Sequence, residues 1–221
     1  MSDLPANIWI EGNIGSGKSS LLALIAQRLS YPVFPEPVSD WTHFQSWRSG
    51  RKINFLDMFY KKSDFVFQFQ TFVLVSMFNR LQSASHFSDL NIFERSGGSS
   101  VQVFAKAALS ENRLTEDEME ILYYLFDTLY ASRFEVDEDN GQSRIIYLDC
   151  PPSICLERTK KRGREEEANV SLSYFELINK HYREWLTKVS IPVYIIDASE
   201  SIEKIYSDFC QYLPVPDLYK Y

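Results

Sequence analysis

The amino-acid sequence predicts an α/β fold in which a five-stranded parallel sheet is flanked by helices. Five short apolar runs alternate with helical patterns, an order that is typical of a parallel sheet covered on both faces. A glycine-rich phosphate-binding motif directly follows the first run. The chain has 221 residues, 45% of them hydrophobic, which is enough for one well-packed domain and too few for two comfortable ones. We therefore expect a single domain over residues 1–221.

The five apolar runs are short enough to be buried strands, and acidic residues stand at or just beyond their carboxyl ends. The predicted strands cover residues 8–10, 31–34, 91–93, 145–148 and 193–196. The acidic residues are Glu11, Glu36, Glu94, Asp149 and Asp197. Ligands of parallel α/β sheets bind beyond the carboxyl ends of the strands, so these residues mark the edge where we expect the site.

Residues 12–19, GNIGSGKS, match the phosphate-binding motif G-x-x-x-x-G-K-[ST] and precede a helical run over 20–29. The glycines let backbone N–H groups turn toward a phosphate, and the helix N-terminus adds its dipole. We expect Lys18 to reach the β- and γ-phosphates and Ser19 to ligate Mg²⁺. The expected donor-binding residues of this loop are Gly12, Asn13, Ile14, Gly15, Ser16, Gly17, Lys18, Ser19 and Ser20. The motif identifies a nucleotide but no acceptor.

Charge, hydropathy and cysteine content exclude several other functions. The net charge of −7 and the isoelectric point near 5.1 argue against nucleic-acid binding, which depends on Lys and Arg. The most apolar segment, residues 65–81, contains polar residues and is too short to predict a membrane span. The three cysteines lack the spacing of a zinc site or a disulfide framework. The first residues, MSDLPANIWIE, do not have the pattern of a leader, so we expect a cytoplasmic enzyme.

Motifs at the ends of the second and third predicted strands make the sequence similar to a known family. The second predicted strand ends in EPVSDW, with Glu36 and Trp41, and the third ends in ERS, with Glu94 and Arg95. Together with GNIGSGKSS, Phe69-Gln70, an arginine-rich stretch and a late IIDAS, they resemble the deoxyribonucleoside kinases in order and spacing over residues 8–198. The resemblance implies a P-loop kinase fold, ATP and Mg²⁺ as cofactors, and a deoxyribonucleoside as substrate.

The resemblance assigns roles to three charged residues at these strand ends. Glu36 matches the catalytic base that accepts the proton of the 5′-hydroxyl. Arg95 matches a catalytic arginine that stabilises the transferring phosphoryl group, and Glu94 matches an acid on the Mg²⁺ side. From the residues alone, Glu36 could also be a solvated carboxylate of a turn, and Glu94 and Arg95 a surface ion pair.

A nucleobase pocket is implied by residues on three segments. Gln70 interrupts the apolar stripe of the 65–81 helix, and a buried amide needs hydrogen-bond partners. It matches the glutamine that pairs with the base edge, while Phe104 matches the stacking aromatic and Trp41 closes the pocket. Without the resemblance, Trp41 and Phe104 would be ordinary core residues.

The sugar is assigned to a tyrosine and a glutamate. Tyr60 and Glu167 match the pair that holds the 3′-hydroxyl, and such a pair would reject dideoxy sugars. Tyr60 precedes two lysines, so a solvated tyrosine is the alternative.

Residues 158–167 are rich in arginine, and Arg158 and Arg162 stand four positions apart on one helix face. In an acidic protein such a run is usually a solvated face of ion pairs. The resemblance implies instead a lid in which Arg158, Arg162 and Arg164 clamp the donor phosphates and exclude water. It also places Asp197 near the donor adenine, with no side-chain role.

The base preference depends on two positions. Family members that prefer purines or deoxycytidine carry an arginine and an aspartate where this chain has Met77 and Ser100. Without that charged pair, the chain resembles the thymidine-accepting members, in which a small residue and an apolar one leave room for a 5-methyl group. We therefore expect pyrimidine deoxyribonucleosides, thymidine and deoxycytidine, as the best substrates. The Gly-Gly-Ser-Ser sequence at 97–100 departs from the bulky apolar residue and the aromatic that the family usually has there, and we expect its two glycines to loosen or shift this turn.

Three alternatives remain open, together with one expected partner. The chain could be a purine deoxyribonucleoside kinase, or a nucleoside monophosphate kinase such as thymidylate kinase, although Glu36 would repel an acceptor phosphate. It could also be a noncatalytic nucleotide-binding subunit. The helices predicted over 65–81 and 116–134 have more apolar surface than one sheet needs, so we expect a homodimer, as in the family.

Overall fold

The structure is a computed structural model, and it describes residues 6–84, 90–130 and 143–213. Its centre is a five-stranded parallel sheet with the strand order β2-β5-β1-β6-β7, which confirms the predicted fold class. The strands of this sheet are β1 (Ala6–Gly12), β2 (Val33–Phe34), β5 (Leu90–Glu94), β6 (Arg144–Asp149) and β7 (Val193–Asp197).

The edge strand β2 is shorter than the predicted 31–34. Pro32 has no N–H group to donate, although its carbonyl oxygen accepts a hydrogen bond from Ile92 N at 3.0 Å. Pro35 follows β2 directly. Prolines on both sides therefore limit the strand to two residues, and an edge position tolerates them.

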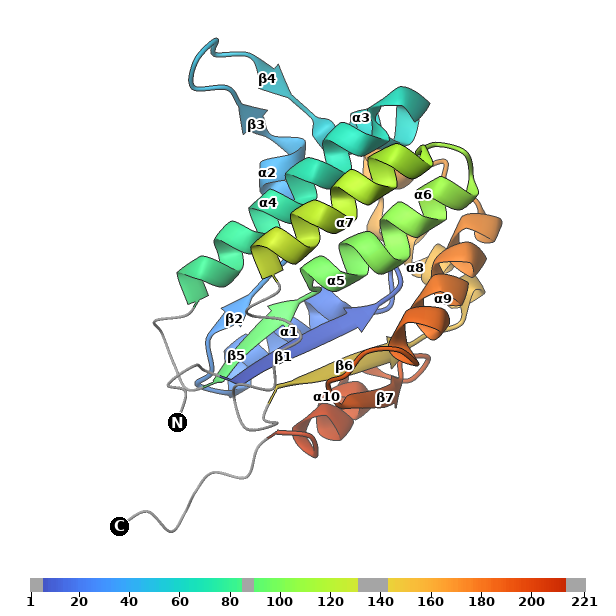
Figure 1. Cartoon of the computed structure of the whole chain (residues 1–221). Helices are drawn as coiled ribbons and strands as arrows, with labels where there is room; N and C mark the ends of the chain where they lie inside the picture. Colours follow the sequence, from blue (N-terminus) through green and yellow to red (C-terminus); the bar gives the residue numbers. More distant parts are fainter. Residues whose placement is uncertain (1–5, 85–89, 131–142, 214–221) are drawn as a thin grey trace.

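Helices cover both faces of the sheet, with α1 and α10 on one face and α4, α7, α9 and the α5–α6 run on the other (Figure 1). The helices are α1 (Lys18–Arg28), α2 (Val38–Thr42), α3 (Phe55–Lys61), α4 (Val66–Ala84), α5 (Gly97–Ser99), α6 (Lys106–Ser110), α7 (Glu116–Tyr130), α8 (Pro152–Arg162), α9 (Leu172–Leu186) and α10 (Ile202–Cys210). The core lies between these layers, and β5 is buried along its whole length.

Some segments differ from the sequence expectations or lie outside the described residues. A short antiparallel hairpin, β3 (Phe44–Gln45) and β4 (Lys52–Ile53), projects beyond α2 and was not predicted (Figure 1). The predicted helix 116–134 is described as far as Tyr130. The loop expected at 137–143 lies, except for Ser143, outside the described residues. Among the helices that the structure describes, none is both long enough and apolar enough to cross a bilayer.

The turn at residues 97–100 is buried, so the expectation that its glycines loosen it was wrong. Ser96 caps this turn, because its hydroxyl accepts a hydrogen bond from Ser99 N. A Cβ atom on Gly97 would lie 2.4 Å from Cζ of Tyr130, which occupies the space beside the backbone. The Tyr130 hydroxyl donates to Leu74 O at 2.8 Å and fixes the ring there. Gly97 therefore permits close packing of α7 against this turn.

The helix that follows this turn contains a π-helical segment over Ser100–Ala105, between α5 and α6. Lys106 N donates to Val101 O, five residues earlier. Such widened turns often occur at functional sites, and this one carries both Ser100 and Phe104.

Candidate active site

A cavity of about 290 Å³ lies beyond the carboxyl ends of β1, β2 and β5. This is the edge of the sheet at which the strand ends predicted a ligand. The predicted site residues that line it are Ile14, Gly15, Gly17, Lys18, Ser19, Glu36, Trp41, Tyr60, Gln70, Met77, Glu94, Arg95, Ser100, Phe104, Arg162, Arg164 and Glu167. The cavity therefore brings together residues that are far apart in the sequence. Ile14 and Glu167, the first and the last of them, are 153 positions apart.

The donor side of the cavity is the glycine-rich loop between β1 and α1. Gly15 and Gly17 have φ angles of 72° and 102°, in the left-handed region that glycine adopts without strain. A Cβ atom on Gly15 would also lie 2.5 Å from Cys155 O. Lys18 Nζ donates to Gly12 O at 3.0 Å and to Asn13 O at 2.7 Å, so the side chain is turned back onto the loop. Burial lowers the pKa of Lys18 to about 8.

Four predicted loop residues do not line the cavity. Asn13 is buried beneath the loop, where its Nδ2 donates to Phe175 O at 2.9 Å and to Asn179 Oδ1 at 2.6 Å. Its Oδ1 accepts a hydrogen bond from the backbone N of Ile14 at 2.8 Å. Asn13 thus fastens the loop to α9. Gly12 and Ser16 are buried as well, and Ser20 is exposed.

Ser19 and Glu94, the predicted metal-side residues, are in contact. Ser19 Oγ donates to Glu94 Oε1 at 2.7 Å, and Glu94 Oε2 lies 3.4 Å from the backbone N of Glu36. Mg²⁺ in phosphoryl-transfer sites usually takes only one or two protein ligands, with phosphate oxygens and water completing its shell. The hydroxyl and carboxylate therefore fit a Mg²⁺ site beside the loop.

Glu36 and Arg95 form an ion pair, with 3.3 Å between Glu36 Oε1 and Arg95 Nη1. Their side chains are only 13% and 10% exposed, so water screens this pair weakly. The Arg95 guanidinium also lies 4.3 Å from the ring centre of Phe104.

Two properties of Arg95 depend on its surroundings. Burial lowers the pKa of Arg95, but Glu36 and the other nearby acidic groups raise it more, so the pKa lies above its ordinary value. Arg95 has a φ of 61°, a strained conformation for a residue with a side chain.

The nucleobase side combines one buried amide with aromatic walls. The hydroxyl of Ser100 donates to Gln70 Oε1 at 3.1 Å, which fixes the orientation of the amide. Trp41 Nε1 donates to Ser76 Oγ at 2.9 Å, and its ring meets Phe69 edge to face. Two polar groups are thus held inside an apolar pocket, an arrangement typical of small-molecule sites.

Tyr60 and Glu167 also line the cavity, and Glu167 is in contact with Arg162 and Arg164. Burial raises the pKa of Tyr60 well above its ordinary value, and Tyr174 and Glu167 add to the effect. Tyr60 is half-buried and lines the cavity. The Glu167 carboxylate accepts hydrogen bonds from Arg162 and Arg164, at 2.7 Å for Arg164 Nη1.

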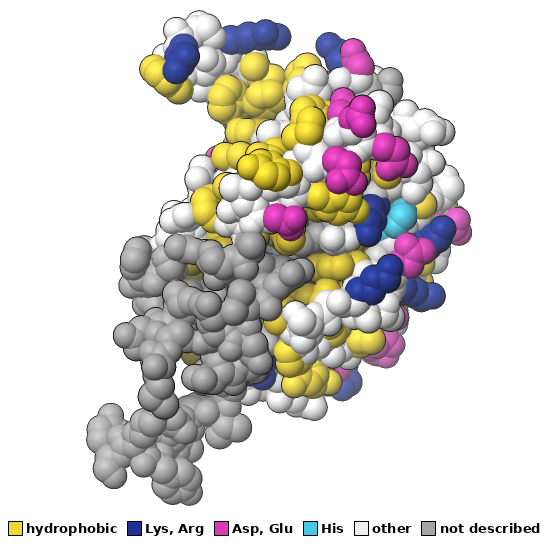
Figure 2. Space-filling view, in the orientation of Figure 1, with side chains coloured by type: hydrophobic (Ala, Val, Ile, Leu, Met, Phe, Trp, Pro, Cys, Tyr) yellow, Lys and Arg dark blue, Asp and Glu magenta, His cyan; other side chains and the backbone are white. Residues whose placement is uncertain are grey.

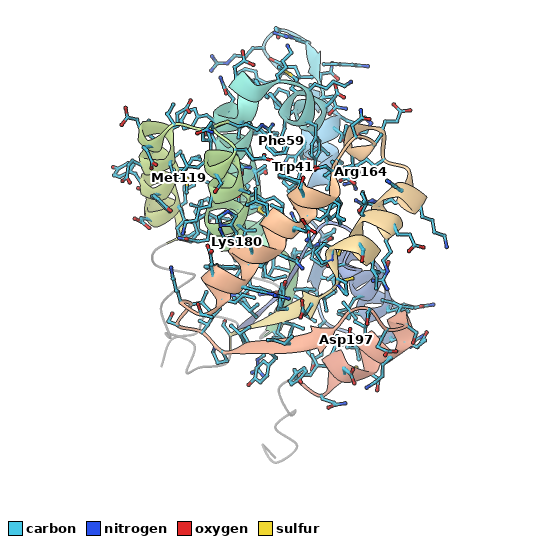
Figure 3. All side chains as sticks on the ribbon, turned by 90° about the vertical axis from the view of Figure 1, so that its right-hand side faces the viewer. Trp41, Phe59, Met119, Arg164, Lys180 and Asp197 are labelled. Carbon is cyan, nitrogen blue, oxygen red and sulfur yellow. The ribbon has the colours of Figure 1, made fainter. Side chains whose placement is uncertain are left out.

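Arg158 lies apart from the other two arginines. Its Nη1 donates to Ala198 O at 2.7 Å and its Nη2 to Ser199 O at 3.3 Å, so it joins α8 to the loop after β7. Asp197 Oδ1 closes this loop by accepting hydrogen bonds from the Ser199 N–H and Oγ. Figure 3 shows Trp41, Phe59 and Arg164 in the upper half of the molecule and Asp197 in the lower half. The two ends of the arginine-rich segment 158–167 thus contact different parts of the protein.

The fold is shared with a solved kinase. The deoxyadenosine kinase of M. mycoides with bound dATP superposes on this chain with a TM-score of 0.76. The two sequences are 24% identical, and the alignment covers 93% of this chain and 97% of the other.

Sequence comparison decides the family. The sequence profile of deoxynucleoside kinases matches residues 8–211. Human mitochondrial thymidine kinase 2 is 31% identical over 210 residues, covering 92% of this chain and 75% of the human protein. Deoxycytidine kinase 2 of Gallus gallus is 31% identical over 228 residues, covering 89% of this chain and 83% of the Gallus gallus protein. The chain belongs to the deoxynucleoside kinase family.

Membership of the deoxynucleoside kinase family confirms the predicted class of enzyme. The protein is a phosphotransferase that acts on deoxynucleosides and uses a nucleotide as the phosphate donor. A noncatalytic nucleotide-binding subunit is therefore excluded.

Several residues of the kinase pocket were not predicted from the sequence. Leu56 and Phe59 line the cavity beside Tyr60. The spacing of Leu56, Phe59 and Tyr60 places them on one face of α3, and this signal could have revealed them. Ser76, which holds Trp41, gives no comparable signal, because a serine inside a helix is usually solvated or bonded to its own helix.

Proposed function

We propose that this enzyme is an ATP-dependent kinase of the 5′-hydroxyl of deoxyribonucleosides, with a preference for thymidine and deoxycytidine. The observation that carries the proposal is the shielded Glu36–Arg95 pair, which lies in the same cavity as the phosphate-binding loop and the Ser19–Glu94 contact. A carboxylate at this point suits a neutral hydroxyl as the acceptor. We also treat the whole chain as one kinase domain.

The proposed mechanism is an in-line transfer that depends on position and charge. Glu36 accepts the proton of the 5′-hydroxyl as its oxygen bonds to the γ-phosphorus of ATP. The bond between this phosphorus and the β,γ-bridging oxygen breaks, and ADP is the leaving group. Arg95 stabilises the charge on the equatorial phosphoryl oxygens. Lys18, which now donates to two loop carbonyls, turns to the β- and γ-phosphates. Ser19 and Glu94 would hold Mg²⁺, which would supply positive charge at the phosphate oxygens.

The pyrimidine preference is inferred from the pocket around Gln70. The amide can pair with the edge of a base, and Met77 and Ser100 beside it place no charge there. A compact apolar wall leaves room for the 5-methyl group of thymidine. The relatives include thymidine and deoxycytidine kinases, whereas a structural neighbour is a deoxyadenosine kinase, so a purine preference is the alternative.

A monophosphate kinase is the less favoured alternative. An acceptor phosphate would require free cationic groups next to the acceptor. The cations that line the cavity in the described residues are Lys18, Arg95, Arg162 and Arg164. Arg95 pairs with Glu36, and both lid arginines bind Glu167. Carboxylates therefore already pair with three of these four cations, which favours a neutral acceptor.

We further propose that the lid closes over the donor. Arg162 and Arg164 are bound to Glu167 in this structure and line the cavity. Donor phosphates would compete with Glu167 for these arginines, and Glu167 would then bind the 3′-hydroxyl together with Tyr60. Arg158 would steady the base of the lid through the loop after β7.

The enzyme is also proposed to form a homodimer through α4 and α7. Val75 on α4 and Ile121 and Tyr124 on α7 are 40%, 48% and 71% exposed. Figure 2 shows hydrophobic side chains over these helices with acidic side chains beside them. Light scattering should return about 52 kDa, twice the 25.8 kDa of one chain, and a value near 26 kDa would contradict the dimer.

We propose that the enzyme is cytoplasmic, because its three cysteines are free thiols and a reducing compartment keeps thiols in this form. A fluorescent fusion that collects in an organelle would contradict this location.

The proposal is tested by a panel of substrates with Mg·ATP. Thymidine, deoxycytidine, deoxyadenosine, deoxyguanosine and thymidylate are compared under identical conditions by kcat/KM. Thymidine and deoxycytidine should give the highest values, and thymidylate should give essentially no product. A higher value for either purine would overturn the base preference, and efficient phosphorylation of thymidylate would overturn the neutral acceptor.

A further inference from the structure

The ends of β2 and β5 are joined by an arginine for which the proposed mechanism has no role. Arg80 extends from α4, and its Nη1 donates to the carbonyl oxygens of Phe34, Pro35 and Glu94 at 3.1, 2.8 and 2.8 Å. Its Nη2 donates to Arg95 O at 2.7 Å. Three acceptors share the two hydrogens of Nη1, so at least one of these bonds is bifurcated. One guanidinium therefore binds four backbone carbonyls from two strands.

These carbonyls belong to the segments that carry the proposed catalytic pair. Glu36 follows Pro35 directly, and Arg95 supplies one of the four carbonyls itself. The guanidinium lies 5.4 Å from the ring centre of Phe93 on β5. The distance between the two strand ends determines how Glu36 meets Arg95, so Arg80 is placed to control that geometry.

The contacts of Arg80 require a charged guanidinium. Burial lowers its pKa to about 10, against the favourable influence of Glu36 and Glu94, so the group stays charged at neutral pH. Among the described residues it makes no ion pair at salt-bridge distance, and its hydrogen bonds go to backbone carbonyls. A partly buried cation of this kind is costly unless hydrogen bonds compensate for lost hydration. Lysine could satisfy fewer of the four acceptors, because its ammonium has three donors and no planar fork.

Arg80 and Glu11 hold opposite sides of the same peptide group. The carbonyl between Arg95 and Ser96 accepts from Arg80, whereas the Ser96 N–H donates to Glu11 Oε1 at 2.9 Å. The Ser96 hydroxyl adds a second bond to the same oxygen at 2.6 Å. The positive φ of Arg95 is a strained conformation, so it persists only where neighbouring groups fix the backbone.

We propose that Arg80 is a positioning residue for phosphoryl transfer, which, with Glu11, holds the Arg95–Ser96 peptide and sets Arg95 against Glu36. It touches neither substrate in this role. The kinetic consequence rests on the proposed function, whereas the effect on the backbone does not.

The kinetic test compares Arg80→Met, which keeps an apolar side chain of similar length, with Arg80→Lys. Arg80→Met should lower kcat about 10²-fold, because small misplacements of reacting groups have effects of this size. The KM for the nucleoside should stay within about threefold, since Gln70 and Tyr60 are untouched. Arg80→Lys should recover part of kcat.

The matched control is Arg144→Met, at the start of β6, where Arg144 Nη1 donates to the carbonyl oxygen of Tyr212 at 2.9 Å. It removes a carbonyl-bound guanidinium far from the cavity and should leave kcat unchanged. A kcat for Arg80→Met equal to that of Arg144→Met, or a loss confined to KM, would overturn the proposal.

Hydrogen exchange tests the same proposal without relying on catalysis. Peptides that end on either side of Ser96 should show that its amide exchanges at least about tenfold faster in Arg80→Met, while the amides of β6 keep their rates. Unchanged exchange at Ser96 overturns the proposal. If the wild-type enzyme phosphorylates none of the nucleosides, the proposed function fails and exchange alone decides this inference. If Arg80→Met does not fold, Arg80→Lys carries both tests.

Discussion

The donor side and the acceptor side of the cavity are built in different ways. The donor side is one continuous segment, residues 12–19, shaped by backbone conformation and glycines. The acceptor side takes single side chains from several elements, such as Glu36 after β2, Gln70 on α4 and Phe104 in the π-helical segment. A local motif therefore determines where phosphate binds, whereas tertiary packing determines what receives it. Substitutions on the donor side should therefore affect all nucleosides alike, whereas substitutions on the acceptor side should affect one nucleoside more than another.

The largest effect is expected on the donor side. Lys18→Met should lower kcat by about 10³-fold for every nucleoside alike, because the charge acts on the shared phosphates. Steady-state kinetics with thymidine and deoxycytidine measure this loss. Lys204→Met on α10, where Lys204 pairs with Asp208, is the control and should keep full activity. A loss that differed strongly between the two nucleosides would contradict the separation of the two sides.

The second effect concerns the packing that supports the acceptor side. Gly97→Ala should lower the free energy of unfolding by about 2–3 kcal/mol, because the new methyl group meets the Tyr130 ring. Gly50→Ala is the control: Gly50 has a φ of 67° but open space around it, so only about 1 kcal/mol is expected. Urea denaturation measures both. Equal losses would mean that Tyr130 moves aside easily.

A smaller and more selective effect is expected at the sugar. Tyr60→Phe should lower kcat/KM for thymidine about tenfold, the size of one lost hydrogen bond, and leave the dideoxy analogue unaffected. The ratio of kcat/KM for thymidine to kcat/KM for the dideoxy analogue should therefore fall about tenfold when both are assayed in parallel. Tyr206→Phe on α10 is the matched control. If both sugars lost the same factor, Tyr60 would not contact the 3′-hydroxyl.

The sequence is informative where structure is local and less so where it depends on packing. The phosphate-binding loop and the acidic strand ends were predicted because the residues responsible are neighbours in the chain. The contact between Gly97 and Tyr130 joins residues 33 positions apart, and the glycines alone suggested looseness instead of close packing. Arg80 interrupts an apolar segment, and only the structure brings its four acceptors together.

The arginine-rich stretch, residues 158–167, also shows that the sequence does not reveal contacts that depend on packing. Helical spacing places Arg158 and Arg162 on one face, but it cannot say what that face meets. In the structure Arg158 binds the loop after β7 and Arg162 binds Glu167. The partners come from other elements, so the sequence pattern predicted a lid without its contacts.

The role of Glu36 as the base is tested by the Glu36→Gln variant, measured by thymidine binding and by single-turnover phosphorylation with Mg·ATP. The single-turnover rate should fall about 10²–10⁴-fold, while the affinity for thymidine should change less than about threefold. Glu203→Gln, which removes a surface carboxylate paired with Arg28, should change neither quantity. A Glu36→Gln enzyme that keeps the wild-type rate would contradict the assignment of Glu36 as the base for a neutral acceptor.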